Sequence, residues 1–127
     1  MPVFTDDGRR EGDYEMSGSA GATGGMRSRD QGILLAGTVG KSGMVVGLVT
    51  ASGKYTPLNT AAADGSQTAA GILFSNVDAS AADKRAVFHV REMEAHDAKL
   101  IWPAGISAPN KAAAIAALKT KGIIVRT

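Results

Sequence analysis

The chain contains no cysteine and only two histidines among its 127 residues. The missing thiols exclude disulfide bonds, thiolate metal sites and thiol nucleophiles. With His89 and His96 alone, a three-histidine metal site is also excluded. No apolar run reaches the roughly 18 residues that span a bilayer, and the acidic N-terminus lacks the apolar centre of a secretory signal. We therefore expect a protein that acts in a reducing, intracellular setting, with no membrane partner, metal or other cofactor.

Aromatic residues are scarce at 5%, and the charges nearly cancel, with 14 Lys and Arg against 12 Asp and Glu. A formal charge of +2 offers little to neutralise phosphates, so we expect no nucleic-acid partner. Glycine is abundant, with 16 residues. This composition favours one small domain with many turns over a large aromatic core.

The first 31 residues differ in composition from the rest. They carry ten charged residues and six glycines, but only Val3 and Phe4 among Val, Ile, Leu and Phe. Such a segment buries too little apolar surface to offset its chain entropy. We predict a flexible N-terminal arm over residues 1–31 and a folded domain over residues 32–127. A tail without a function is the alternative to an arm that orders on a partner.

From residue 32 onward, short β runs alternate with turn residues, which predicts a mainly β body. The expected strands cover residues 33–39, 44–50, 54–58, 71–74, 85–91, 99–102 and 123–125. Residues 76–84 and the acidic segment 92–97 are expected to be loops. The alanine-rich stretch 111–121 predicts one late α-helix, with Ser107 as its N-cap, Pro109 in its first turn and Gly122 at its end.

The common catalytic motifs are absent. Gly40-Lys41-Ser42 resembles the end of a P-loop, but Leu35 stands where that motif requires a glycine. The chain has neither a G-x-G pattern nor a G-x-S-x-G pattern. We therefore do not expect an enzyme.

The histidines and the neighbouring acids have a structural and a chemical interpretation. His89 lies in an expected strand and is assigned to its solvent or interface face. His96 lies in the acidic segment, where Glu92 and Glu94 are expected to form an exposed rim. A general base at His96 or a cation held by the two acids is the alternative.

Trp102 is the single tryptophan, and Pro103 follows it directly. In a chain with so few aromatics, this pair is expected to be a structural anchor: Trp102 fills the core and Pro103 ends the strand before it. An interface hot spot at Trp102 is the alternative.

The order of short motifs resembles a known family. The motifs are Leu48-Val49-Thr50, Ser52-Gly53-Lys54, Asp64-Gly65, Gly71-Ile72-Leu73, Leu100-Ile101-Trp102-Pro103, a Ser-capped helix and a final Gly-Ile-Ile-Val strand. Over residues 44–127 this order is similar to that of the head decoration proteins of tailed phages, the family of the lambda capsid protein D. The chain departs from that pattern in its acidic segment 92–97 and in the additional β run 33–39.

The resemblance implies a β-clip fold with no catalytic residues. It implies a homotrimer that binds the major capsid protein at three-fold or quasi-three-fold sites on the outside of an expanded head. There it would act as cement against the pressure of packaged DNA, in the virion, after synthesis in the host cytoplasm. A small β-barrel module that binds nucleic acid or oligosaccharide through exposed aromatics is the alternative.

The arm would then contact the capsid by adding extended strands to exposed sheet edges. Three arms on one trimer would raise the strength of binding through avidity. From the composition of the arm, we predict apolar contacts and charge partners at Phe4, Tyr14, Met16, Met26, Arg27 and Arg29.

Overall fold

The computed structural model describes residues 11–12, 14–18 and 28–127, and these form a mainly β fold with one α-helix near the C-terminus. The predicted fold class, mainly β with one late helix, is therefore confirmed. The strands are β1 (Glu15–Gly18), β2 (Arg29–Leu34), β3 (Thr38–Gly40), β4 (Val45–Val49), β5 (Lys54–Pro57), β6 (Ala69–Leu73), β7 (Val77–Ala79), β8 (Lys84–His89), β9 (Met93–His96) and β10 (Ile123–Arg126). The short 3-10 helix η2 (Asp97–Lys99) and the helix α1 (Ala108–Thr120) lie between β9 and β10.

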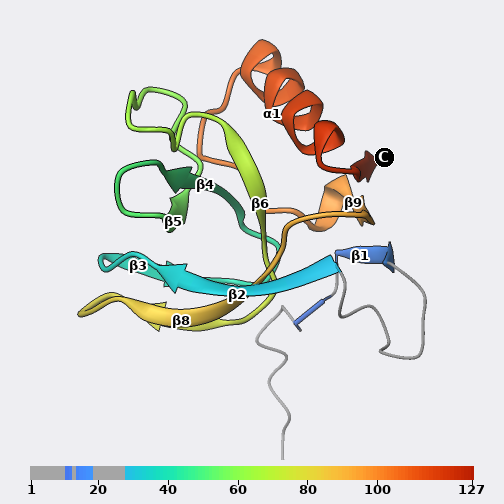
Figure 1. Ribbon diagram of the computed structural model, residues 1–127. Helices are drawn as coiled ribbons and strands as arrows, with labels where there is room; N and C mark the ends of the chain where they lie inside the picture. The colour runs from blue at the N-terminus through green and yellow to red at the C-terminus, as the bar shows by residue number, and fades with distance from the viewer. Residues whose placement is uncertain (1–10, 13, 19–27) are drawn as a thin grey trace, which may run out of the picture.

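Five strands close into a small barrel in the order β2-β5-β4-β6-β8 (Figure 1). The barrel closes through a single parallel pair, Leu34 with Tyr55. β4 and β5 form the expected antiparallel hairpin, and Pro57 falls at the end of β5, where a missing N–H disturbs the ladder least.

A three-stranded sheet in the order β1-β9-β10 lies beside the barrel, and β3 pairs with β7 in a separate ribbon. The central strand β9 is antiparallel to β1 and parallel to β10. α1 packs against β6 and β10. In Figure 1, α1 and the β2–β8 pair lie on opposite sides of the molecule.

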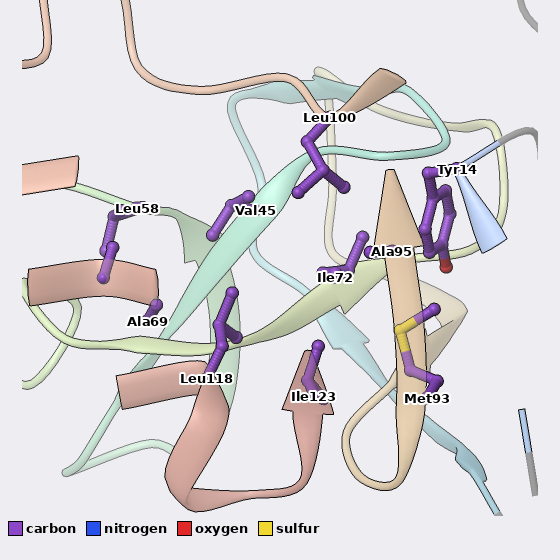
Figure 2. Close-up of a cluster of buried hydrophobic side chains, with 11 residues drawn as sticks. Tyr14, Val45, Leu58, Ala69, Ile72, Met93, Ala95, Leu100, Leu118 and Ile123 are labelled. Atoms are coloured by element: carbon purple, nitrogen blue, oxygen red, sulfur yellow. The ribbon is translucent and has the colours of Figure 1, made fainter. Parts of the chain in front are cut away.

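The barrel strands separate two hydrophobic cores. Neighbouring residues of one strand point to opposite faces, so Val45 belongs to one core and Val46 to the other. Ile72 and Leu73 divide in the same way on β6. The outer core lies between the barrel, α1 and the three-stranded sheet, and includes Tyr14, Ile72, Met93, Ala95, Leu100, Leu118 and Ile123 (Figure 2).

The helix begins and ends as predicted. The Ser107 hydroxyl accepts a hydrogen bond from the Asn110 N–H at 3.3 Å, and Pro109 lies in the first turn. Gly122 has a φ of +80°, the left-handed conformation in which a glycine ends a helix without strain. Ala114 and Leu118 are the buried residues of the helix, one turn apart.

Four expectations about elements were wrong. The run 33–39 is broken by a turn in which Gly37 has a φ of +97°, so β2 ends before β3 begins. Both expected loops contain strands, β7 within residues 76–84 and β9 within residues 92–97. Residues 99–102 form no strand, because η2 occupies their start and only Ile101 makes a bridge, with Met44.

Candidate functional site

The segment before the first strand is attached to the barrel by backbone contacts. We call residues 11–12 and 14–18 the N-terminal strap. The Asn76 N–H donates to the Glu11 carboxylate at 3.0 Å, and the Gly12 N–H donates to the Ser42 hydroxyl at 3.0 Å. Gly12 has a φ of +83°, and a Cβ placed there would lie 3.0 Å from the Phe74 ring. The strap therefore follows the barrel surface closely from its first described residue.

Tyr14 fixes the strap in the outer core. Its side chain is fully buried, and Figure 2 shows it beside Ala95. Its ring meets the His89 imidazole edge to face, with centroids 5.4 Å apart, and its hydroxyl is hydrogen-bonded to His89 Nδ1. Burial raises the pKa of Tyr14 far above its usual value, and the nearby Glu15 carboxylate adds to the effect. Tyr14 is therefore a neutral, structural side chain at physiological pH.

His89 of β8 lies at the centre of a polar cluster to which β2 contributes Arg29 and the strap contributes Tyr14 and Glu15. Arg29 Nε donates to His89 Nε2 at 3.2 Å, and a second Arg29 nitrogen lies 3.0 Å from the Glu15 carboxylate. Burial lowers the pKa of His89 to about 4, with a smaller lowering from Arg29 and an opposing rise from Glu15. A neutral imidazole has one donor and one acceptor, so we assign the proton to Nδ1, which donates it to the Tyr14 oxygen.

Arg29 also contacts Phe74, an aromatic side chain that packs against His89. Its guanidinium lies 4.2 Å from the centre of the Phe74 ring, a favourable cation–π distance. Phe74 in turn contacts His89 edge to face, at 5.5 Å between centroids. The cluster thus joins β1, β2, β8 and the residue that directly follows β6 around one buried histidine.

β1 presents a sheet edge beyond this cluster. It pairs with β9 through Glu15–Ala95, Ser17–Glu94 and Gly18–Met93, and its register shifts between Glu15 and Ser17. Among the described strands, β1 is the terminal member of its sheet. Met16 is 51% exposed, one of two large hydrophobic side chains with that much exposure in the described part of the chain. An apolar side chain on an unpaired edge is suited to binding an extended partner segment.

The structure locates three of the six predicted arm contacts. Met16 is exposed on β1, and its contact with a capsid stays a prediction. Tyr14 was predicted as a surface contact, and this is wrong, because its ring fills the outer core. Arg29 was predicted near the root of an arm, but it lies within β2 and pairs with Glu15 of the same chain. Phe4, Met26 and Arg27 lie outside the described residues.

Where the chain is described, parts of the predicted arm are paired with the body. Glu15 to Gly18 pair with β9, and Arg29 to Gln31 pair with β8. Backbone hydrogen bonds, rather than side-chain hydrophobicity, carry much of this attachment, which is why the composition of residues 1–31 did not reveal it.

The expectation for His89 was wrong as well. The alternation along β8 places His89 on the outer barrel face and Phe88 on the inner one, and the sequence predicts that the outer face meets solvent or an interface. The strap and Phe74 cover it, so His89 has no exposed surface. A buried pair of Tyr and His 75 positions apart leaves no local signal in the sequence.

Trp102 contacts both the outer core and a charged pair, Asp97 and Lys111. Trp102 is half-buried against the outer core, and its indole N–H donates to Asp97 at 2.8 Å. Lys111 of α1 pairs with the other Asp97 oxygen at 3.0 Å and lies 5.2 Å from the Trp102 ring centre. Burial is the largest single influence on the Asp97 pKa, and it raises that pKa. The hydrogen bonds from Lys111 and Trp102 and the nearby positive charge of Lys111 outweigh it, so the Asp97 pKa lies below its usual value. The three side chains connect η2, the following loop and the helix.

The remaining polar candidates form no site. Glu94 pairs with Arg126 on the neighbouring strand at 2.9 Å, and the His96 ring accepts the Ala98 N–H. Within the described residues, no group of three or more His, Asp or Glu side chains is placed to hold a metal ion. The described aromatic side chains are all buried or half-buried, so none offers an open stacking surface. No described helix is long and apolar enough to cross a membrane.

Within the described residues, the small β-barrel encloses a packed core and the apolar edge at β1 has no partner strand, an arrangement suited to binding through the surface. Residues 10–123 match the family described as bacteriophage lambda head decoration protein D, and the chain belongs to this family. Its role is therefore that of a structural protein that decorates a phage capsid, and its place is the virion. A search of curated proteins finds no significant match.

Proposed function

We propose that the protein binds as a homotrimer at three-fold sites on the outside of an expanded head, where it contacts the major capsid protein. It would stabilise the shell against the pressure of packaged DNA, and it would do so without catalysis. The family supports the decoration role. The three-fold geometry, the trimer and the stabilisation are our proposal.

The edge strand β1 carries this proposal. Tyr14 in the core and Glu15 on Arg29 fix the backbone at the start of β1, while Met16, the next residue, stays exposed. A preorganised edge loses little conformational entropy when a partner strand adds to it. Three such edges on one trimer would bind together with high avidity.

The test uses expanded empty capsids that lack the protein. We expect Met16→Asp to weaken co-sedimentation with capsids by about tenfold or more, because a charge opposes burial of that edge. Val39→Asp is the matched control, since Val39 is also 51% exposed but lies on β3. Equal binding by the two variants would contradict a role for β1. Light scattering of the free and bound protein tests the trimer separately, and rupture of coated and bare capsids tests the stabilisation.

A further inference from the structure

The strap closes over His89, and its contacts fit a neutral imidazole. The Tyr14 oxygen is hydrogen-bonded to Nδ1, Arg29 Nε donates to Nε2 at 3.2 Å, and the His89 side chain has no exposed surface. Among the described residues, the titratable and charged side chains that face the ring are Tyr14 and Glu15 of the strap and Arg29 of β2. Phe74, which follows β6, adds an apolar ring. The strap therefore supplies a large part of the cover and of the polar contacts of His89.

A second proton on the His89 ring is incompatible with these contacts. An imidazolium has two donors and no acceptor, so the Arg29 Nε–H would face another N–H, and two positive charges would be in direct contact. The Glu15 carboxylate lies 3.5 Å from Nε2 and favours the imidazolium, but it is already paired with Arg29 at 3.0 Å. Burial, together with Arg29, outweighs Glu15 and lowers the pKa of His89 to about 4. Protonation of His89 therefore favours a state in which the strap has moved away and water reaches the ring.

The strap is attached in a way that allows it to leave while the barrel stays folded. Among the described strands, β1 pairs only with β9, and Figure 1 shows β1 at the margin of the fold. The five barrel strands pair with one another, independently of β1. The inner core is also built without the strap, and its buried members are Leu34, Val46, Leu73, Ala79, Ala86 and Phe88. An edge element with few long-range pairs opens locally at a lower free energy than the strands of a closed barrel.

We propose that His89, Tyr14, Glu15 and Arg29 form an acid-sensitive latch, in which a proton on His89 releases the strap from a barrel that stays folded. Release takes the Tyr14 ring out of the outer core and separates Glu15 from Arg29. It also removes Met16 from its fixed position on the sheet edge. Acid would then weaken the binding of that edge to a capsid, and this consequence alone rests on the proposed function.

Amide hydrogen exchange of the full chain, followed by NMR, tests the latch. The His96 N–H bonds to the Tyr14 carbonyl at 2.8 Å and reports on the strap, whereas the Leu73 N–H bonds to the Met44 carbonyl at 2.8 Å and reports on the barrel. At pH 5 we expect the His96 amide to be protected at least about tenfold less than the Leu73 amide. Between pH 7 and pH 5 its protection factor should fall about twentyfold, because the pKa of His89 is about 4 under the strap and about 6.5 once released. Equal protection of the two amides would mean that the strap leaves only when the barrel unfolds, and would overturn the proposal.

Two matched variants separate the latch from a general loosening in acid. His89→Gln keeps a polar side chain that does not titrate, so the protection of the residue 96 amide should change by less than about twofold between pH 7 and pH 5. His96→Gln removes the other histidine and should keep the twentyfold fall. A fall that persists in His89→Gln, or one that is lost in His96→Gln, would overturn the proposal. In the wild type, which needs no substitution, so would a His89 imidazole that titrates near pH 6.5 by NMR while the His96 amide keeps its protection. None of these measurements involves capsids, so they are independent of the proposed function.

Discussion

At the scale of single residues, Tyr14 links the strap to the fold. We expect Tyr14→Ala to lower the free energy of unfolding by about 3–5 kcal/mol, because it leaves a cavity in the outer core. Tyr14→Phe keeps the ring but leaves His89 Nδ1 without its partner, so it should lower the free energy of unfolding by about 1–3 kcal/mol. Urea unfolding followed by circular dichroism measures both. If Tyr14→Phe matched the wild type, the Tyr14–His89 hydrogen bond would contribute nothing to stability.

His89 makes stability depend on pH. Its pKa is about 4 in the folded protein, against about 6.5 in an unfolded chain, so the unfolded state binds more protons between these values. We expect the stability to fall as the pH drops from about 6.5 to about 4, by a few kcal/mol at most. His89→Gln removes the titrating group, so the difference between wild type and variant isolates its contribution from that of the carboxylates. A difference that stays constant over this range would contradict a buried, neutral His89.

Single residues also mark where sequence reasoning stops. The alternation of Ala86 and Phe88 correctly identifies the inner face of β8, because it depends only on the strand period. Whether the outer face of β8 is buried or exposed depends on whether a distant segment of the chain covers it. Tyr14 supplies that cover from 75 positions away, and no property of either residue's neighbours encodes the contact.

At the scale of elements, the turn at Asp64-Gly65 controls the approach of a loop to β4. Gly65 has a φ of +106°, and a Cβ there would lie 2.6 Å from the Leu48 carbonyl oxygen and closer still to the Thr50 hydroxyl. We expect Gly65→Ala to destabilise the fold by more than about 2 kcal/mol, through backbone strain and a clash that only a loop shift can relieve.

Gly53 offers the matched control for that substitution. Its φ is +68° and a Cβ would meet nothing within 4 Å, so Gly53→Ala should cost only about 1 kcal/mol of backbone strain. Thermal unfolding of both variants measures the contrast. If the two variants lost the same stability, the close approach of Gly65 to β4 would not contribute to the cost of Gly65→Ala.

Elements with local signals were predictable, and those set by tertiary pairing were not. α1 has its cap, its first-turn proline and its terminal glycine in the sequence, and all three have the predicted roles. β9 has only the four residues Met-Glu-Ala-His, among acids that suggested a loop. It forms a strand because β1 and β10 pair with it on both sides, and both partners are far away in the chain.

At the scale of the whole molecule, the family could be inferred from the order of motifs, but the extent of the folded body could not. The match covers residues 10–123, so it includes the strap that composition had assigned to an arm. Averaging hydrophobicity over 31 residues hid one tyrosine that contributes a full core side chain. We therefore propose that the folded body begins near residue 11, where the first described contact with the rest of the fold occurs.

Two truncations test that boundary. We expect deletion of residues 1–10 to leave the free energy of unfolding close to that of the full chain, because every described contact of the strap remains. Deletion of residues 1–18 removes Tyr14 and β1, exposes the edge of β9 and leaves His89 without its cover. The loss of a core aromatic alone lowers the free energy of unfolding by about 3–5 kcal/mol. We therefore expect this deletion to lower it by at least that much, as measured by urea unfolding. If the two truncated proteins were equally stable, the strap would be a passive segment, and β1 could not present Met16 to a capsid in a fixed position.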